Sequence, residues 1–135
     1  MTVLVGLRCK DGAVLACDSQ ETRVNYFRFW PKVALVGGSF VALCVGNPTL
    51  SEAFARKLDC SIRHAKKDGQ IDRPKAAELV EDALVSLAKE AGEDAVKGRQ
   101  ILIAGTTDAN EICLWAVDAG EIYLREMRTC ATAQE

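Results

Sequence analysis

Histidine is nearly absent from this sequence, and aromatic residues and proline are scarce. The 135 residues contain one histidine, His64, and three prolines, and aromatic residues make up 6%. His64 lies in a charged segment with Arg63 and Lys66, where it is poorly suited to a Ser-His-Asp arrangement or a zinc ligand set. The Gly-x-Ser-x-Gly elbow, the P-loop, the dinucleotide fingerprint and His-Glu-x-x-His do not occur either. Any catalytic chemistry must therefore come from other residue types.

Long apolar runs and a charge excess are also absent. No apolar stretch approaches the roughly 18 residues of a membrane span, and no basic segment precedes the apolar residues 2–7, so a secretory leader is not expected. The 17 Lys+Arg residues against 19 Asp+Glu residues give a net charge of −2, without the basic excess typical of nucleic-acid binding. We expect one domain over residues 1–135, located in the cytoplasm, with neither nucleic acid nor a membrane as partner.

The cysteines are more numerous but widely dispersed. Six are present, and no two form a Cys-x-x-Cys pair. They are Cys9, Cys17, Cys44, Cys60, Cys113 and Cys130. This spacing fits neither a disulfide framework nor a zinc site, so we expect reduced and mostly buried side chains, no metal and no cofactor.

Two β-hairpins are predicted in the first third of the chain. Residues 3–9 and 13–17 are apolar runs around the turn sequence Lys10-Asp11-Gly12, and residues 33–37 and 40–46 repeat the pattern around Gly37-Gly38-Ser39. The strands are apolar nearly throughout, which is typical of strands covered on both faces. Something must therefore cover each sheet.

Two helices and three further strands follow. A capping-box sequence at 49–52 and apolar residues at every fourth position predict a helix over 49–67. A second helix is expected from Asp72, its N-cap, to Gly92. Residues 100–105, 111–117 and 121–127 then read as strands. Strands, a helix pair and strands in that order predict an α+β layered domain and not a doubly wound fold.

The position of Thr2 offers chemistry that needs no histidine. Once Met1 is removed, an N-terminal threonine carries both a hydroxyl nucleophile and an α-amine with a pKa near 8 that can act as the base. A single residue then supplies two catalytic roles.

The opening stretch TVLVGLRCKDGAVLACDS, residues 2–19, resembles the start of proteasome β-type subunits, including the bacterial ring protease that works with an ATPase. These proteins are N-terminal nucleophile (Ntn) hydrolases of the threonine peptidase type. The resemblance implies an Ntn-hydrolase-like four-layer αββα sandwich. It also implies a threonine endopeptidase subunit of a homo-oligomeric cytosolic ring that cleaves polypeptide and works with an ATPase or another regulatory partner.

The resemblance also assigns the site. It implies Thr2 as nucleophile, Asp18 as the carboxylate that orients a lysine, Lys32 as the cation that lowers the pKa of the hydroxyl, and Gly46 as the N–H donor of the oxyanion hole. Thr22 matches a position that binds substrate backbone in an extended conformation. The remaining matches line the pocket for the side chain before the scissile bond, and they are Glu21, Trp30, Ala34 and Cys44.

The match to this pattern ends early. Members of the family continue through a Gly-Ser-Gly-like turn and further helices and strands, whereas residues 129–135 here read TCATAQE. We therefore expect the C-terminal third of the pattern to be missing, one helical layer to be incomplete and one sheet face to be exposed, which favours a homo-oligomer. Two alternatives stay open: a catalytically silent Ntn-fold structural subunit, and an Ntn amidohydrolase acting on a small molecule.

Overall fold

A computed structural model of the chain describes residues 2–18, 20–23, 26–29, 33–44, 48–118 and 123–134. Within these ranges only the backbone is described at residues 2, 20–23, 26–29, 44, 48, 123 and 129–134.

Three sheets form within these ranges. The largest has five antiparallel strands in the order β5-β6-β7-β8-β9, which span Val33–Val36, Phe40–Cys44, Gln100–Thr106, Ile112–Asp118 and Tyr123–Glu126. The second has three strands in the order β10-β1-β2, which span Thr129–Gln134, Thr2–Arg8 and Ala13–Cys17. The third is the hairpin of β3 (Gln20–Arg23) and β4 (Tyr26–Phe29).

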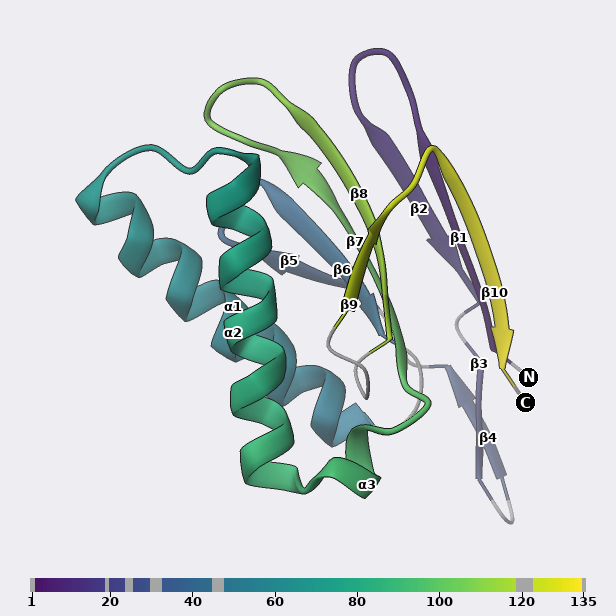
Figure 1. Ribbon diagram of the computed structural model, residues 1–135. Coiled ribbons are helices and arrows are strands. Elements are labelled where there is room, and N and C mark those ends of the chain that lie inside the picture. The colour runs from purple at the N-terminus through teal and green to yellow at the C-terminus, as the bar shows by residue number, and fades with distance from the viewer. Residues whose placement is uncertain are drawn as a thin grey trace.

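The helices form one layer. α1 (Pro48–Asp68) and α2 (Arg73–Ala91) lie on one side of the five-stranded sheet, with the short α3 (Glu93–Val96) after them, and the three-stranded sheet lies on the other side (Figure 1). This arrangement confirms the predicted α+β layered fold. A helical layer on the outer face of the three-stranded sheet is not among the residues that the structure describes.

The second helix begins and ends as the sequence predicts. Asp72 is its N-cap and accepts a hydrogen bond from the backbone N–H of Lys75 at 2.9 Å, and Pro74 lies in its first turn. Gly92 ends the helix with φ 89°, a conformation that side chains disfavour.

The main core lies between the helices and the five-stranded sheet. Phe54, Leu58 and Ile62 of α1 are buried there at the predicted four-residue spacing. On the sheet side, Phe40 stacks with Trp115 at a ring-centroid distance of 6.4 Å. A smaller core between the two sheets is centred on Leu4, Leu43 and Leu102. Among the described side chains, fewer are buried between the two sheets than beneath the helices.

The predicted burial of strands on both faces is correct for only part of the molecule. Residues 101–104 of β7 are buried on both faces. By contrast, four large apolar side chains are exposed on the outer side of β1 and β2, and two more are exposed on β5. They are Val3, Val5, Leu7, Val14, Val33 and Leu35. No helix among the described elements covers the first group.

Four of the described elements were not predicted: β3 and β4, which form a hairpin, α3 and β10. β10 pairs along β1 from Leu7 opposite Thr129 to Thr2 opposite Gln134, so the two ends of the described chain lie side by side (Figure 1). Residues 129–134 have no clear apolar alternation, and pairing with an existing strand decides their conformation. β10 therefore consists of residues for which the sequence pattern predicted neither a helix nor a strand.

Cysteine burial was only partly predicted correctly. Cys9, Cys60 and Cys113 are free thiols, as expected, but Cys9 and Cys60 are exposed while Cys113 is buried. Cys9 follows the last residue of β1, and Cys60 lies on the outer side of α1.

The turn between β5 and β6 is fastened to α1. Gly37 donates its N–H to Asp59 Oδ1 at 2.7 Å, and its carbonyl oxygen accepts from Lys66 Nζ at 2.8 Å. The Gly37 N–H and then Arg63 lower the pKa of the Asp59 carboxyl. Because the ionised form is favoured in the fold, this contact is complete at neutral pH and is lost only as the pH falls through the lowered pKa.

Candidate active site

Thr2 lies at a position that the strand pairing defines. It is the first residue of β1 and pairs with Gln134 of β10 on one side. On the other side, β1 pairs with β2 up to Leu4 opposite Cys17, and Asp18 follows directly. The first residue of β1 is therefore held between the ends of two neighbouring strands.

Asp18 is bonded to the residue next to Thr2. Its carboxylate Oδ1 accepts the backbone N–H of Val3 at 3.0 Å, and its own N–H donates to the Val3 carbonyl oxygen at 3.3 Å. A charged acceptor makes the first of these bonds stronger than a neutral one. The resemblance implies that Asp18 orients a lysine. The observed hydrogen bond gives Asp18 a second role, which is to fix the backbone of β1 at Val3.

Substitutions at Asp18 separate these two roles. Asp18→Asn keeps an acceptor oxygen for Val3 and should leave the free energy of unfolding nearly unchanged, whereas Asp18→Ala should lower it by about 0.5–1.5 kcal/mol. If the negative charge also orients a lysine, Asp18→Asn should lower kcat at least about tenfold. Urea unfolding and peptide hydrolysis measure the two effects. Full activity in Asp18→Asn would restrict Asp18 to a structural role.

Several other residues assigned from the resemblance either lie outside the described residues or have only their backbone described. Trp30, Lys32 and Gly46 lie outside the described residues. Glu21 and Thr22 lie on β3, opposite positions 28 and 27 of β4, and only their backbone is described. Their proposed roles stay predictions.

Two matched positions lie in the five-stranded sheet. Cys44 ends β6 opposite Ile101, with its backbone alone described. Ala34 lies in β5 opposite Ala42, and its side chain packs against the core beneath the helices. The methyl group of Ala34 therefore contributes to packing on the helical side of the sheet.

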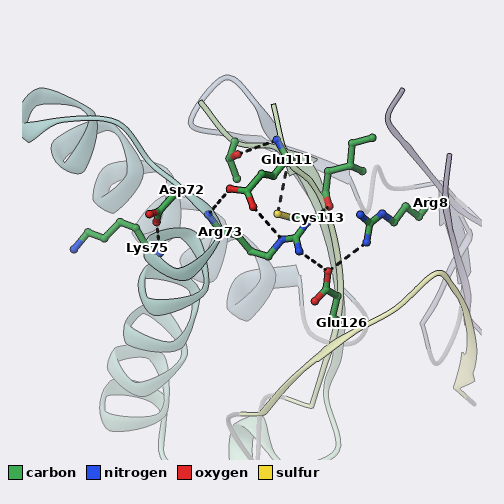
Figure 2. Close-up of polar contacts among 9 residues, drawn as sticks. Arg8, Asp72, Arg73, Lys75, Glu111, Cys113 and Glu126 are labelled. Atoms are coloured by element: carbon green, nitrogen blue, oxygen red, sulfur yellow. Dashed lines mark hydrogen bonds and ion pairs between the residues drawn. The ribbon is translucent and has the colours of Figure 1, made fainter. Parts of the chain in front are cut away.

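A polar cluster that the sequence did not indicate joins the three layers (Figure 2). Arg73 is the first residue of α2, and its Nη1 atom lies 3.1 Å from Glu126 Oε1. The same oxygen lies 3.3 Å from Arg8 Nη1. Arg73 also donates to the Ile112 carbonyl oxygen at 3.1 Å, and its backbone N–H donates to Glu111 at 3.3 Å. One carboxylate thus links the helix layer to the end of β1.

The buried thiol in this cluster is not a nucleophile. Burial raises the pKa of Cys113, an effect that the neighbouring Arg73 partly opposes, and contact with Cys113 in turn raises the pKa of Arg73. Cys113 therefore remains a protonated thiol at neutral pH and lacks the exposed thiolate that cysteine chemistry requires. Arg73 Nε is buried and has no hydrogen-bond partner among the described atoms, with Glu111 Oε2 3.9 Å away. The cluster is a structural connection.

The described ranges contain neither a cluster of metal-ligating side chains nor a helix suited to cross a membrane. No three His, Cys, Asp or Glu side chains gather there in a way that could hold a metal ion. None of the helices in the same ranges combines the length and the apolar character needed to cross a membrane.

Comparison with known proteins gives a likeness of fold. No family model matches the chain, and no curated protein matches it. Among solved structures, a mutant of Anbu from Hyphomicrobium sp. strain MC1 superimposes with a TM-score of 0.76 at 18% identity, covering 100% of this chain and 61% of that chain. The chain therefore has the Ntn-like fold of that protein.

These comparisons correct the family assignment. Assigning the chain to the proteasome β-type subunits is wrong, because no model of that family matches and the structural likeness rests on 18% identity. What stands is a proteasome-like fold. The chain spans 61% of the length of the Anbu chain, so activity, substrate and partners of the whole protein belong to the proposal that follows.

Proposed function

We propose that the protein is a hydrolase that cleaves peptide bonds with Thr2 as its N-terminal nucleophile. The observation that carries this proposal is the place of Thr2 at the start of β1, beside the Asp18–Val3 contact, in an Ntn-like fold. The described alternatives are weak, because Cys113 is a buried protonated thiol and His64 is exposed on α1.

The reaction needs a free α-amine on Thr2. Removal of Met1 exposes this amine, which takes the hydroxyl proton as Thr2 Oγ1 attacks the peptide carbonyl carbon. The Gly46 N–H stabilises the oxyanion, the amine of the leaving peptide departs with the proton, and an ester joins Thr2 to the acyl part. Water then hydrolyses the ester, which restores the hydroxyl and releases the carboxylate product.

Lys32 is proposed to stabilise the developing alkoxide as a compact cation, with Asp18 orienting it. Lys32→Ala should then lower kcat by about 10²-fold or more, since the hydroxyl pKa rises. Lys32→Arg should not restore the rate, because the planar guanidinium places its charge differently. Steady-state hydrolysis of a fluorogenic peptide measures both variants. A near-normal rate in Lys32→Arg would reduce Lys32 to a remote charge.

The proposed substrate is extended polypeptide, bound along β3 at Thr22 with Glu21, Trp30, Ala34 and Cys44 around the substrate side chain. The proposed setting is the cytoplasm, and the proposed assembly is a homo-oligomeric ring with an ATPase or other regulatory partner. The exposed apolar side of β1 and β2 supports association with further polypeptide.

The deciding experiment is the intact mass of protein made in cells. A retained Met1 converts the α-amine of Thr2 into an amide, which cannot act as a base. Loss of the mass of one methionine is the result we expect. Retention of Met1 in the mature cellular form would overturn the proposal and favour a catalytically silent subunit of the same fold. Substrate profiling separates a peptidase from a small-molecule amidohydrolase.

A further inference from the structure

One edge of the five-stranded sheet is open. β5 pairs with β6, and no other described strand pairs with its second edge. Its sequence, Val-Ala-Leu-Val, carries no charge. Natural edge strands usually carry lysines, prolines or bulges that prevent pairing with another strand. β5 has none of these within its four residues, and no strand in the described part of the chain occupies its outer edge.

Two side chains of β5 are apolar and exposed. Val33 is 52% exposed and Leu35 is 70% exposed, the largest exposure among the large apolar residues of the described chain. The two lie on one face of the sheet, because they are two residues apart. That is the face opposite the helices, since Ala34 and Val36 pack beneath them. The three-stranded sheet packs against β6, β7 and β8 on this face and leaves these side chains in solvent.

We propose that β5 pairs with β5 of a second copy of this chain, antiparallel and across a two-fold axis perpendicular to the sheet. Residues directly opposite one another on neighbouring strands share a face. The register that places Ala34 opposite Ala34 therefore places Val33 of each copy opposite Leu35 of the other. The two exposed apolar residues of one copy then contact those of the other copy, on the same face.

A second copy satisfies this edge better than an unrelated partner for two reasons. The pairing is isologous, so one uncharged four-residue strand supplies both halves of the interface without like-charge repulsion. The two-fold axis also keeps both helical layers on the same side of a continuous sheet, where α1, which packs against β5, approaches α1 of the other copy. Because four residues form a small interface, the dimer is expected to be weak, with a Kd of about 10–100 µM.

Sedimentation equilibrium of the full chain over a dilution series tests the proposal. Leu35→Lys places two charges in the interface and should raise Kd at least about tenfold. The matched control is Val85→Lys, a change of the same kind at a residue 36% exposed on α2, and it should leave Kd unchanged. Dissociation by Val85→Lys in place of Leu35→Lys would overturn the proposal, and so would a wild-type monomer at ~1 mM.

A disulfide readout tests the register without charge. In a Cys9→Ser, Cys60→Ser background, which lacks the exposed thiols found in the described chain, Ala34→Cys should oxidise to a covalent dimer. Opposite Cα atoms in an antiparallel pair lie about 4.5–5.5 Å apart, within the range that a disulfide spans. Ala16→Cys, exposed on β2, is the control that should stay monomeric. Equal dimer yields in the two variants would overturn the pairing.

Discussion

Thr2→Ala is expected to lower hydrolysis of a fluorogenic peptide by about 10³-fold or more, since the substitution removes the attacking oxygen and leaves only binding and oxyanion stabilisation. The free energy of unfolding should change little, because Thr2 is the first residue of β1 and its strand pairing with Gln134 uses backbone groups. Initial rates and urea unfolding on the same preparation measure both effects.

Two matched variants sharpen this result. Thr2→Ser retains a hydroxyl and an α-amine and should retain hydrolysis, while Thr129→Ala makes the same chemical change at the other end of the β1–β10 pair, opposite Leu7, and should leave the rate unchanged. Full activity in freshly purified Thr2→Ala would place the nucleophile elsewhere. Inactivity of the wild-type protein with a free Thr2 amine would favour the silent subunit.

The layered fold could be predicted because the local patterns agree with the tertiary structure. The Asp72 cap, the Gly92 end and the i+4 spacing of Phe54, Leu58 and Ile62 on α1 each depend on a few neighbouring residues. β10 could not be predicted in this way. Its conformation depends on β1, more than 120 residues earlier in the chain, and no local periodicity records such a pairing.

The candidate site shows the same division. Asp18 lies beside the start of β1 because the predicted hairpin returns β2 along β1, and the catalytic roles assigned to Thr2 and Asp18 stay predictions. The Arg73 cluster could not be found from sequence, since Arg8, Arg73 and Glu126 come from three distant elements. The spacings from Thr2 to Asp18, Lys32 and Gly46 were also insufficient to assign a family. A fold can be shared by proteins that are only 18% identical, so spacings that suit the fold do not identify one family within it.

Gly37→Ala is expected to be the most destabilising of the single-methyl additions in the β5–β6 turn. Gly37 has φ 60°, and a Cβ there would collide with the Cβ, Cγ2 and Cδ1 atoms of the buried Ile62. The left-handed conformation costs a side chain about 1–2 kcal/mol, and overpacking adds about 1–3 kcal/mol. The turn could relieve the collision only by moving away from α1, which would strain the bonds that Gly37 makes with Asp59 and Lys66.

Gly38→Ala isolates the contribution of packing in this prediction. Gly38 has φ 80°, so it carries the same backbone cost, but a Cβ there meets nothing within 4 Å. Urea unfolding should therefore show a loss of about 2–5 kcal/mol for Gly37→Ala and about 1–2 kcal/mol for Gly38→Ala, with unchanged m-values. Equal losses in the two variants would mean that Ile62 and α1 yield without cost. The close approach of the turn to the helix would then be irrelevant to the stability of the layer that supports β5.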